Sequence, residues 1–189
     1  MITVDEANKL VKGILSEKRY YHSVCVMERC AEYAEMLGLN VEDAKIIGLM
    51  HDLAKEMPKE DKVKYCEENK IEIDDIERYH INLLHGKIAA HISKTKYGLR
   101  DELADAIRYH TTGRKNMTLW DKILYVADTT GIDRDYSNTE YFYNLSKENF
   151  VKALIEILKY TINDRLQEGK FIHMLSVEAY NDLVLKEYE

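Results

Sequence analysis

The chain has 189 residues, of which 46% are hydrophobic and 32% charged, a composition typical of a globular protein with its own core. Its formal net charge of -7 argues against broad binding to nucleic acid or to an anionic membrane, since both need a basic face. No apolar run approaches the ~20 residues that cross a bilayer. The cysteines lack CxxC spacing and no signal peptide is recognisable, so we expect a single cytoplasmic domain over residues 1–189.

The first half of the chain predicts helices that begin at capping residues. Thr3 and Glu6 form a capping box, and an apolar pattern of three- and four-residue steps runs over residues 17–37 until Gly38. Asn40 caps a third helix that reaches His51, and Pro58 begins a fourth over residues 59–69. Residues 71–82 are polar and predict irregular structure.

The second half predicts helices over residues 84–97, 101–110 and 121–129, then a loop over 131–144 rich in Tyr and Asp. Ser146 is expected to cap a long helix ending at residue 168, and Ser176 a last helix ending at 188. No strand pair is apparent. The sequence therefore predicts an all-α bundle of about eight helices.

Residues suited to metal binding lie at three places. His51-Asp52 follows an apolar run, and imidazole nitrogen and carboxylate oxygen are ligands for zinc, iron and manganese. Asp128 ends the apolar run that begins at Ile123, where a buried carboxylate is costly unless a cation or donors meet it. His22 shares a helix face with Arg19. Taken singly, each residue also fits a structural role, as a core histidine or a helix cap.

The order His22, His51-Asp52, Asp128 resembles the signature of the HD-domain metal-dependent phosphohydrolases, an all-α superfamily. Three further stretches resemble its YqeK type, the symmetrical diadenosine tetraphosphatases. These are Leu83-Leu84-His85-Gly86, His110-Thr111-Thr112-Gly113, and Asp128 followed six residues later by Arg134. The resemblance covers nearly the whole chain.

The resemblance implies a divalent metal held by His22, His51, Asp52 and Asp128. Iron is the expected ion, with manganese, zinc, cobalt or nickel as alternatives, and one or two ions per chain. The metal would activate water to attack phosphorus, splitting diadenosine tetraphosphate into two ADP. Asp52, His85 and His110 are the candidate catalytic residues. The two histidines either bind a second metal, or they donate hydrogen bonds to the phosphates or protonate the leaving oxygen. The resemblance favours the second role.

Cations must meet the negative charges of such a substrate. Arg19, Lys55 and Arg134 are the candidates, because arginine donates two parallel hydrogen bonds to phosphate and Lys55 lies one turn beyond His51. Lys55 and Arg134 also fit solvated surface positions. The remaining predicted substrate contacts are the hydroxyl of Thr111, the metal ligands His22, Asp52 and Asp128, and the histidines His85 and His110. The resemblance also implies a wall against the nucleoside, made by Lys170, Phe171, Ile172 and His173, although Phe171 by itself also fits the core.

The chain departs from the family pattern at a few positions. Gly131-Ile132 stands where the family usually has Glu-Pro, Met174 where it has Pro, and Tyr180 where it has Arg. These changes leave the ligands intact. The alternatives are another HD nucleotide phosphohydrolase and a nucleotide-sensing module without turnover; a homodimer is also left open.

Overall fold

The computed structural model describes residues 1–134 and 138–187, and in these ranges its regular structure is entirely helical. The all-α fold class is therefore confirmed. The elements are α1 (Val4–Ile14), α2 (Glu17–Leu37), α3 (Val41–Met50), α4 (Lys59–Glu68), α5 (Asp75–Tyr79), the 3-10 turn η1 (Ile81–Leu83), α6 (Leu84–Tyr97), α7 (Asp101–Tyr109), α8 (Leu119–Thr130), α9 (Thr139–Glu148), α10 (Phe150–Gln167) and α11 (Met174–Glu187).

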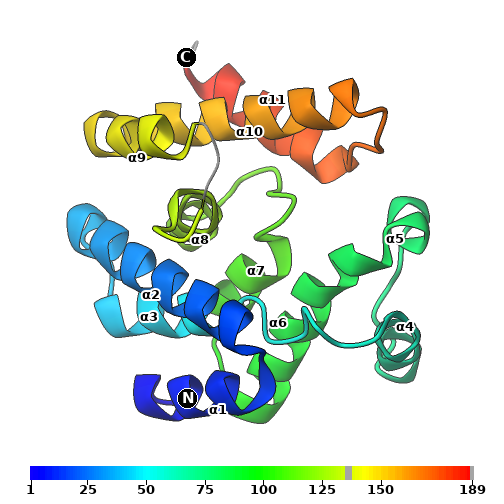
Figure 1. Ribbon diagram of the computed structural model, residues 1–189. Coiled ribbons are helices and arrows are strands. Elements are labelled where there is room, and N and C mark those ends of the chain that lie inside the picture. Colours follow the sequence, from blue (N-terminus) through cyan, green and yellow to red (C-terminus); the bar gives the residue numbers. More distant parts are fainter. Residues whose placement is uncertain (135–137, 188–189) are drawn as a thin grey trace.

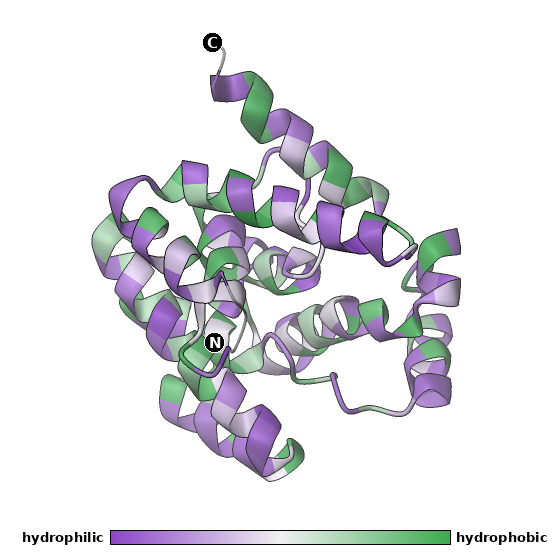
Figure 2. Ribbon diagram, turned by 45° about the horizontal axis from the view of Figure 1, so that its top comes forward, coloured by the Kyte–Doolittle hydropathy of each residue, from purple (hydrophilic) through white to green (hydrophobic). Residues whose placement is uncertain are grey.

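Helix α8 occupies the centre of the molecule (Figure 1). On one side lie α9, α10 and α11, and on the other lie α2, α3, α6 and α7, with α1 beyond them. The strongest packing joins α2 to α3 and α6 to α7, and α8 contacts α2, α7 and α10. A cluster of buried hydrophobic residues extends from Ala7 in α1 to Leu183 in α11. Hydrophilic and hydrophobic residues alternate along most helices, as Figure 2 shows. Across the described ranges, none of the helices combines the length and apolar character needed to cross a bilayer.

Local sequence signals set several helix ends. The capping boxes of Thr3 with Glu6 and Thr118 with Asp121 are both formed, and Asn40 accepts a hydrogen bond from the backbone of Asp43. Gly38 and Gly98 end α2 and α6 with φ of 69° and 70°, in the left-handed region that suits glycine.

Gly48 permits the close crossing of α2 and α3. A Cβ at this position would lie 2.6 Å from the Cα of Met27 and 2.8 Å from its backbone nitrogen. Only glycine avoids that overlap without moving a helix. The approach brings the end of α3, where His51 and Asp52 lie, against the helix that carries His22.

Four predictions about helix boundaries were wrong. Residues 139–148 form α9, although we expected a loop over 131–144, of which residues 135–137 lie outside the described ranges. Ser146 lies inside α9 and hydrogen-bonds Tyr33, while Asn149 caps α10. Helix α11 begins at Met174, before Ser176, and α5 lies in the segment expected to be irregular. The described part of the chain thus has eleven α-helices, not about eight.

Tertiary packing explains the error at α9. Phe142 is buried and its ring lies 5.6 Å from that of Tyr160 in α10, so this segment packs against α10 through Phe142.

Candidate active site

His51 is the fully buried C-cap residue of α3, and Asp52 follows it. His51 Nδ1 donates a hydrogen bond to the carbonyl oxygen of Gly48 at 2.7 Å. The ring therefore presents the lone pair of Nε2 to the interior. His51 Nε2 and Asp52 Oδ1 are both buried, and neither has a hydrogen-bond partner among the residues that the structure describes.

His85 and His110 are fixed in the same manner. Each ring donates from Nδ1 to the carbonyl oxygen three residues earlier, that of Asn82 for His85 and that of Ile107 for His110. The two Nε2 atoms lie 3.1 Å apart, and Asp52 Oδ1 lies 3.0 Å from His85 Nε2. Gly86 permits this approach of α6 to α7, because a Cβ there would lie 3.0 Å from the carbonyl oxygen of Arg108.

His22 approaches the cluster from α2. Its Nδ1 donates to Asp133 Oδ2 at 2.7 Å, so its Nε2 presents a lone pair, 3.0 Å from Asp128 Oδ1. Asp128 lies near the end of α8, and Asp133 follows that helix. Asp133 was not among the predicted site residues. In the sequence, Asp133 differs from other acidic residues only in lying shortly after Asp128, and its partner His22 is 111 positions away.

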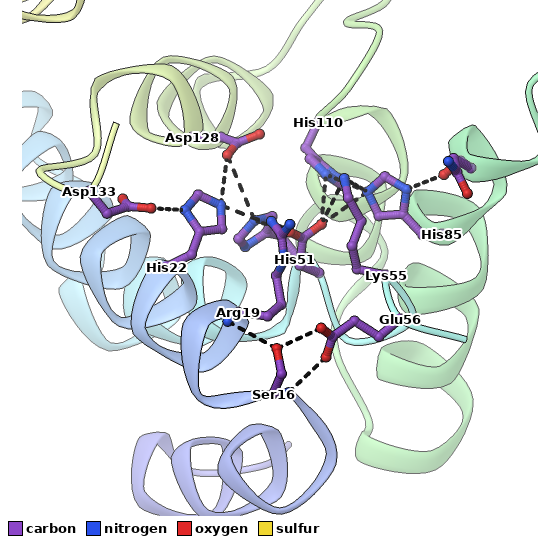
Figure 3. A network of polar contacts seen from close by, with 12 residues as sticks. Ser16, Arg19, His22, His51, Lys55, Glu56, His85, His110, Asp128 and Asp133 are labelled. Atoms are coloured by element: carbon purple, nitrogen blue, oxygen red, sulfur yellow. Dashed lines mark hydrogen bonds and ion pairs between the residues drawn. The ribbon is translucent and has the colours of Figure 1, made fainter. Parts of the chain in front are cut away.

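Figure 3 shows these side chains pointing toward one another from different helices. Within this cluster, two groups have ligand atoms within 4.8 Å of one another: His22, His51 and Asp128, and His51, Asp52 and His110. Buried lone pairs and carboxylates that converge without protons between them repel one another unless a cation joins them. The four predicted metal ligands therefore lie together, and their donor set fits a divalent ion.

The three predicted phosphate-binding cations contact carboxylates of this cluster. Arg19 Nη1 lies 2.9 Å from Asp52 Oδ2, and Lys55 Nζ lies 3.5 Å from Asp52 Oδ1 and 3.2 Å from His85 Nε2. Arg134 forms an ion pair with Asp128, and its Nη2 lies 3.2 Å from His22 Nε2. The cations are thus adjacent to the ligands.

Burial and neighbouring groups shift three pKa values in the cluster. Burial by itself raises the pKa of Asp52, but the surrounding imidazoles, first of all His51, outweigh it and hold that pKa well below its usual range. Burial likewise opposes ionisation of Asp128, yet the neighbouring His22 imidazole and the charge of Arg134 hold the pKa of Asp128 well below its usual range. Burial is the main cause that lowers the pKa of His85 to about 4, which agrees with a neutral ring.

A cavity of about 350 Å³ adjoins the cluster at Lys55 and His85. Its lining includes six of the predicted substrate contacts: Lys55, His85, Thr111, Phe171, Ile172 and His173. Lys170 is not part of this lining and pairs with Glu168. Thr161 and Arg165 of α10, together with His80, also line the cavity. These three were not predicted, because neither an exposed helical pattern nor a polar irregular segment reveals which residues face a neighbouring element.

Comparison with known proteins identifies the family to which this chain belongs. The HD domain model matches residues 19–131, which include all four predicted ligands. The chain belongs to the HD-domain family. Relatives of the chain include proteins named symmetrical bis(5'-nucleosyl)-tetraphosphatase. The protein of Bacillus subtilis is 33% identical, with 95% of this chain and 97% of the relative aligned, and that of Halalkalibacterium halodurans is 33% identical over 96% and 97%.

A solved structure has the same fold. It is described as a predicted HD superfamily hydrolase involved in NAD metabolism from Clostridium acetobutylicum. It superposes with a TM-score of 0.93 at 33% identity, covering 98% of this chain and 99% of the other.

One departure from the family pattern has a structural consequence. A Cβ on Gly131 would lie 2.8 Å from Asp133 Oδ1. The glycine therefore leaves room for the carboxylate that orients His22.

Proposed function

We propose that this HD-domain protein is an enzyme that hydrolyses diadenosine tetraphosphate symmetrically to two ADP. One observation carries the proposal: buried imidazole lone pairs and two carboxylates converge beside cationic side chains, at the edge of a cavity that can take a nucleotide. The tetraphosphatases named above support this choice of substrate, since they match this chain over nearly its full length.

His22, His51, Asp52 and Asp128 would hold the metal. A divalent ion bound there supplies Lewis acidity and lowers the pKa of water. We propose iron, in line with the sequence resemblance, although histidine and carboxylate donors accept several divalent ions. The proposal is one ion per chain, with His110 kept for the reaction.

Lys55, Arg19 and Arg134 would neutralise the phosphates. Lys55 contacts both the ligand cluster and the cavity, so its ammonium can meet a phosphate at their border. His85 Nε2, a lone-pair acceptor, lies 3.2 Å from Lys55 Nζ and would position that ammonium.

Asp52 and His110 are proposed to move the proton. Asp52 Oδ1 has no hydrogen-bond partner among the described residues and would accept a hydrogen from the attacking water. His110 Nε2 lies 3.7 Å from that oxygen, so it can receive the proton and pass it to the departing ADP oxygen. The new bond forms between water oxygen and a central phosphorus, and the bond to the bridging oxygen of the leaving ADP breaks.

The rest of the substrate would extend into the cavity. Thr111 offers a hydroxyl donor there, and Phe171, Ile172 and His173 line the far side, where we place the nucleoside.

Product analysis tests the proposal. Purified protein is loaded with ferrous iron or manganese and incubated with diadenosine tetraphosphate, and the products are separated by ion-exchange chromatography. We expect ADP alone. Formation of AMP with ATP, or release of phosphate from mononucleotides in preference to cleavage of the dinucleotide, would contradict it. An absence of turnover with either metal would favour a sensing module.

A further inference from the structure

A hydrogen bond joins the start of α5 to the segment between α10 and α11, two elements far apart in sequence. His173 Nε2 lies 2.8 Å from Asp74 Oδ2. The backbone N–H of Leu175 donates to His173 Nδ1 at 3.2 Å, so Nε2 carries the ring proton and donates it to the carboxylate. The His173 side chain is only 9% exposed. Figure 1 shows α5 and the α10–α11 connection on the same side of the molecule.

Asp74 also begins α5. Its Oδ1 accepts a hydrogen bond from the backbone of Glu77 at 2.9 Å, and the Glu77 side chain accepts one from the backbone of Asp74. Glu77 is buried and pairs with Lys87 of α6 at 2.6 Å. Asp74, Glu77 and His173 lie close enough to hold a metal, but the Lys87 ammonium already neutralises Glu77. The contacts therefore form a continuous link from α6, the helix that carries His85, to His173.

Aromatic rings meet beside this link. The ring of Phe171 stacks on that of Tyr79 with centroids 5.5 Å apart and an interplanar angle of 29°, and it meets His80 edge-on. Tyr79 is 77% exposed and Phe171 54% exposed, whereas large apolar groups usually gain by burial. Phe171, His80 and His173 all line the cavity.

We propose that Asp74 is a positioning residue for nucleoside binding. By holding His173, it fixes Phe171 against Tyr79 and makes α5 and the α10–α11 connection one wall of the cavity. The wall contacts the nucleoside, whereas the cations of the ligand cluster contact the phosphates. This inference rests on the proposed function only in that a nucleotide occupies the cavity.

The test compares Asp74→Ser with the matched control Asp75→Ser. Serine keeps a capping oxygen for α5 but is too short to reach His173. Asp75 is fully exposed and lies 4.0 Å from Arg78, away from His173. Calorimetry on the metal-loaded protein measures the dissociation constants of ADP and of inorganic pyrophosphate, and initial rates give KM and kcat for the dinucleotide.

We expect Asp74→Ser to weaken ADP binding and raise KM by about tenfold, as for loss of one charge-assisted hydrogen bond. Pyrophosphate affinity and kcat should stay within about twofold, because the phosphate contacts are intact. Asp75→Ser should leave every value unchanged. Unchanged ADP affinity in Asp74→Ser, equal losses for ADP and pyrophosphate, or no ADP binding by the parent protein would overturn the inference.

A second variant guards against misfolding of the first. Phe171→Leu changes an exposed ring and should give the same selective loss of ADP affinity; an unaltered affinity would contradict the inference. The two proposals fail differently. A parent protein that binds ADP but does not cleave the dinucleotide refutes the proposed function alone, whereas normal cleavage with unaltered ADP affinity in both variants refutes this inference alone.

Discussion

The ligand cluster and the far wall of the cavity are built in opposite ways. In the cluster, His51, His85 and His110 are buried, and each ring is held by a carbonyl three residues earlier in its own segment. In the wall, exposed rings from α5 and the α10–α11 connection meet, and the pair of Asp74 with His173 joins them. We infer that the proposed reacting centre is held mostly by contacts within each ligand's own segment, with His22 and Asp133 as the exception, whereas the proposed nucleoside site depends on a few long-range contacts.

The largest expected effect comes from removing a carboxylate of the cluster. Asp52→Ala or Asp128→Ala should abolish hydrolysis, a loss of at least ~10³-fold in kcat, because the metal loses a ligand and its water is no longer activated. Steady-state kinetics with saturating metal measure the loss. Asp101→Ala, at an exposed site paired with Lys94, is the control. Turnover near the parent value in either cluster variant would show that the ligand assignment is wrong.

Removing the His110 side chain should lower kcat without lowering the metal content of the protein. We expect His110→Ala to lower kcat by roughly 10²-fold or more, as for loss of a proton-transfer group, with metal content near that of the parent protein. Kinetics and elemental analysis of the same sample check both values. Loss of half the metal per chain would instead assign His110 to a second ion.

The close crossing of α2 and α3 can be tested through stability. Gly48→Ala should lower the free energy of unfolding by about 1–3 kcal/mol, because its Cβ would overlap the backbone of Met27. Urea denaturation measures the change. Gly13→Ala, where a Cβ meets nothing within 4 Å, should not destabilise the protein. Equal stability of the two variants would refute the role given to this glycine.

A smaller effect is expected where the chain departs from its family pattern. Gly131→Ala should lower kcat about threefold to tenfold, because the new Cβ would displace the Asp133 carboxylate that orients His22. Asp133→Asn should have a similar effect, since the amide weakens the same contact. Full activity in both variants would show that His22 needs no support from Asp133.

The smallest effect is expected at the wall. Arg165→Gln should raise KM about threefold without changing kcat, because a partly exposed cation beside the cavity adds only modest electrostatic attraction for an anionic ligand. Raising the salt concentration should reduce the difference between the two proteins. A larger fall in kcat than in affinity would show that Arg165 acts in the chemical step and not in substrate binding.

The same contrast explains what the sequence could reveal. Several helix ends can be predicted from the sequence because capping acts within a few residues, as at Thr3, Gly38 and Asn40. His51-Asp52 and Asp128 were predicted as metal ligands because polar side chains in apolar runs need a cation or hydrogen-bond donors to offset the cost of burial. The family resemblance then added His22 to the predicted ligands. The contact of Asp133 with His22 and the stacking of Phe171 on Tyr79 join distant segments, so no local pattern encodes them. Helix α9 was missed for the same reason: the packing that favours it is tertiary.

Elemental analysis of protein purified without added metal tests the central claim most directly, namely that His22, His51, Asp52 and Asp128 form one metal centre. The account predicts about one divalent ion per chain in the parent protein and in Asp101→Ala, and nearly none in Asp128→Ala, whose fold is checked by circular dichroism. Equal metal content in the parent protein and Asp128→Ala would contradict it.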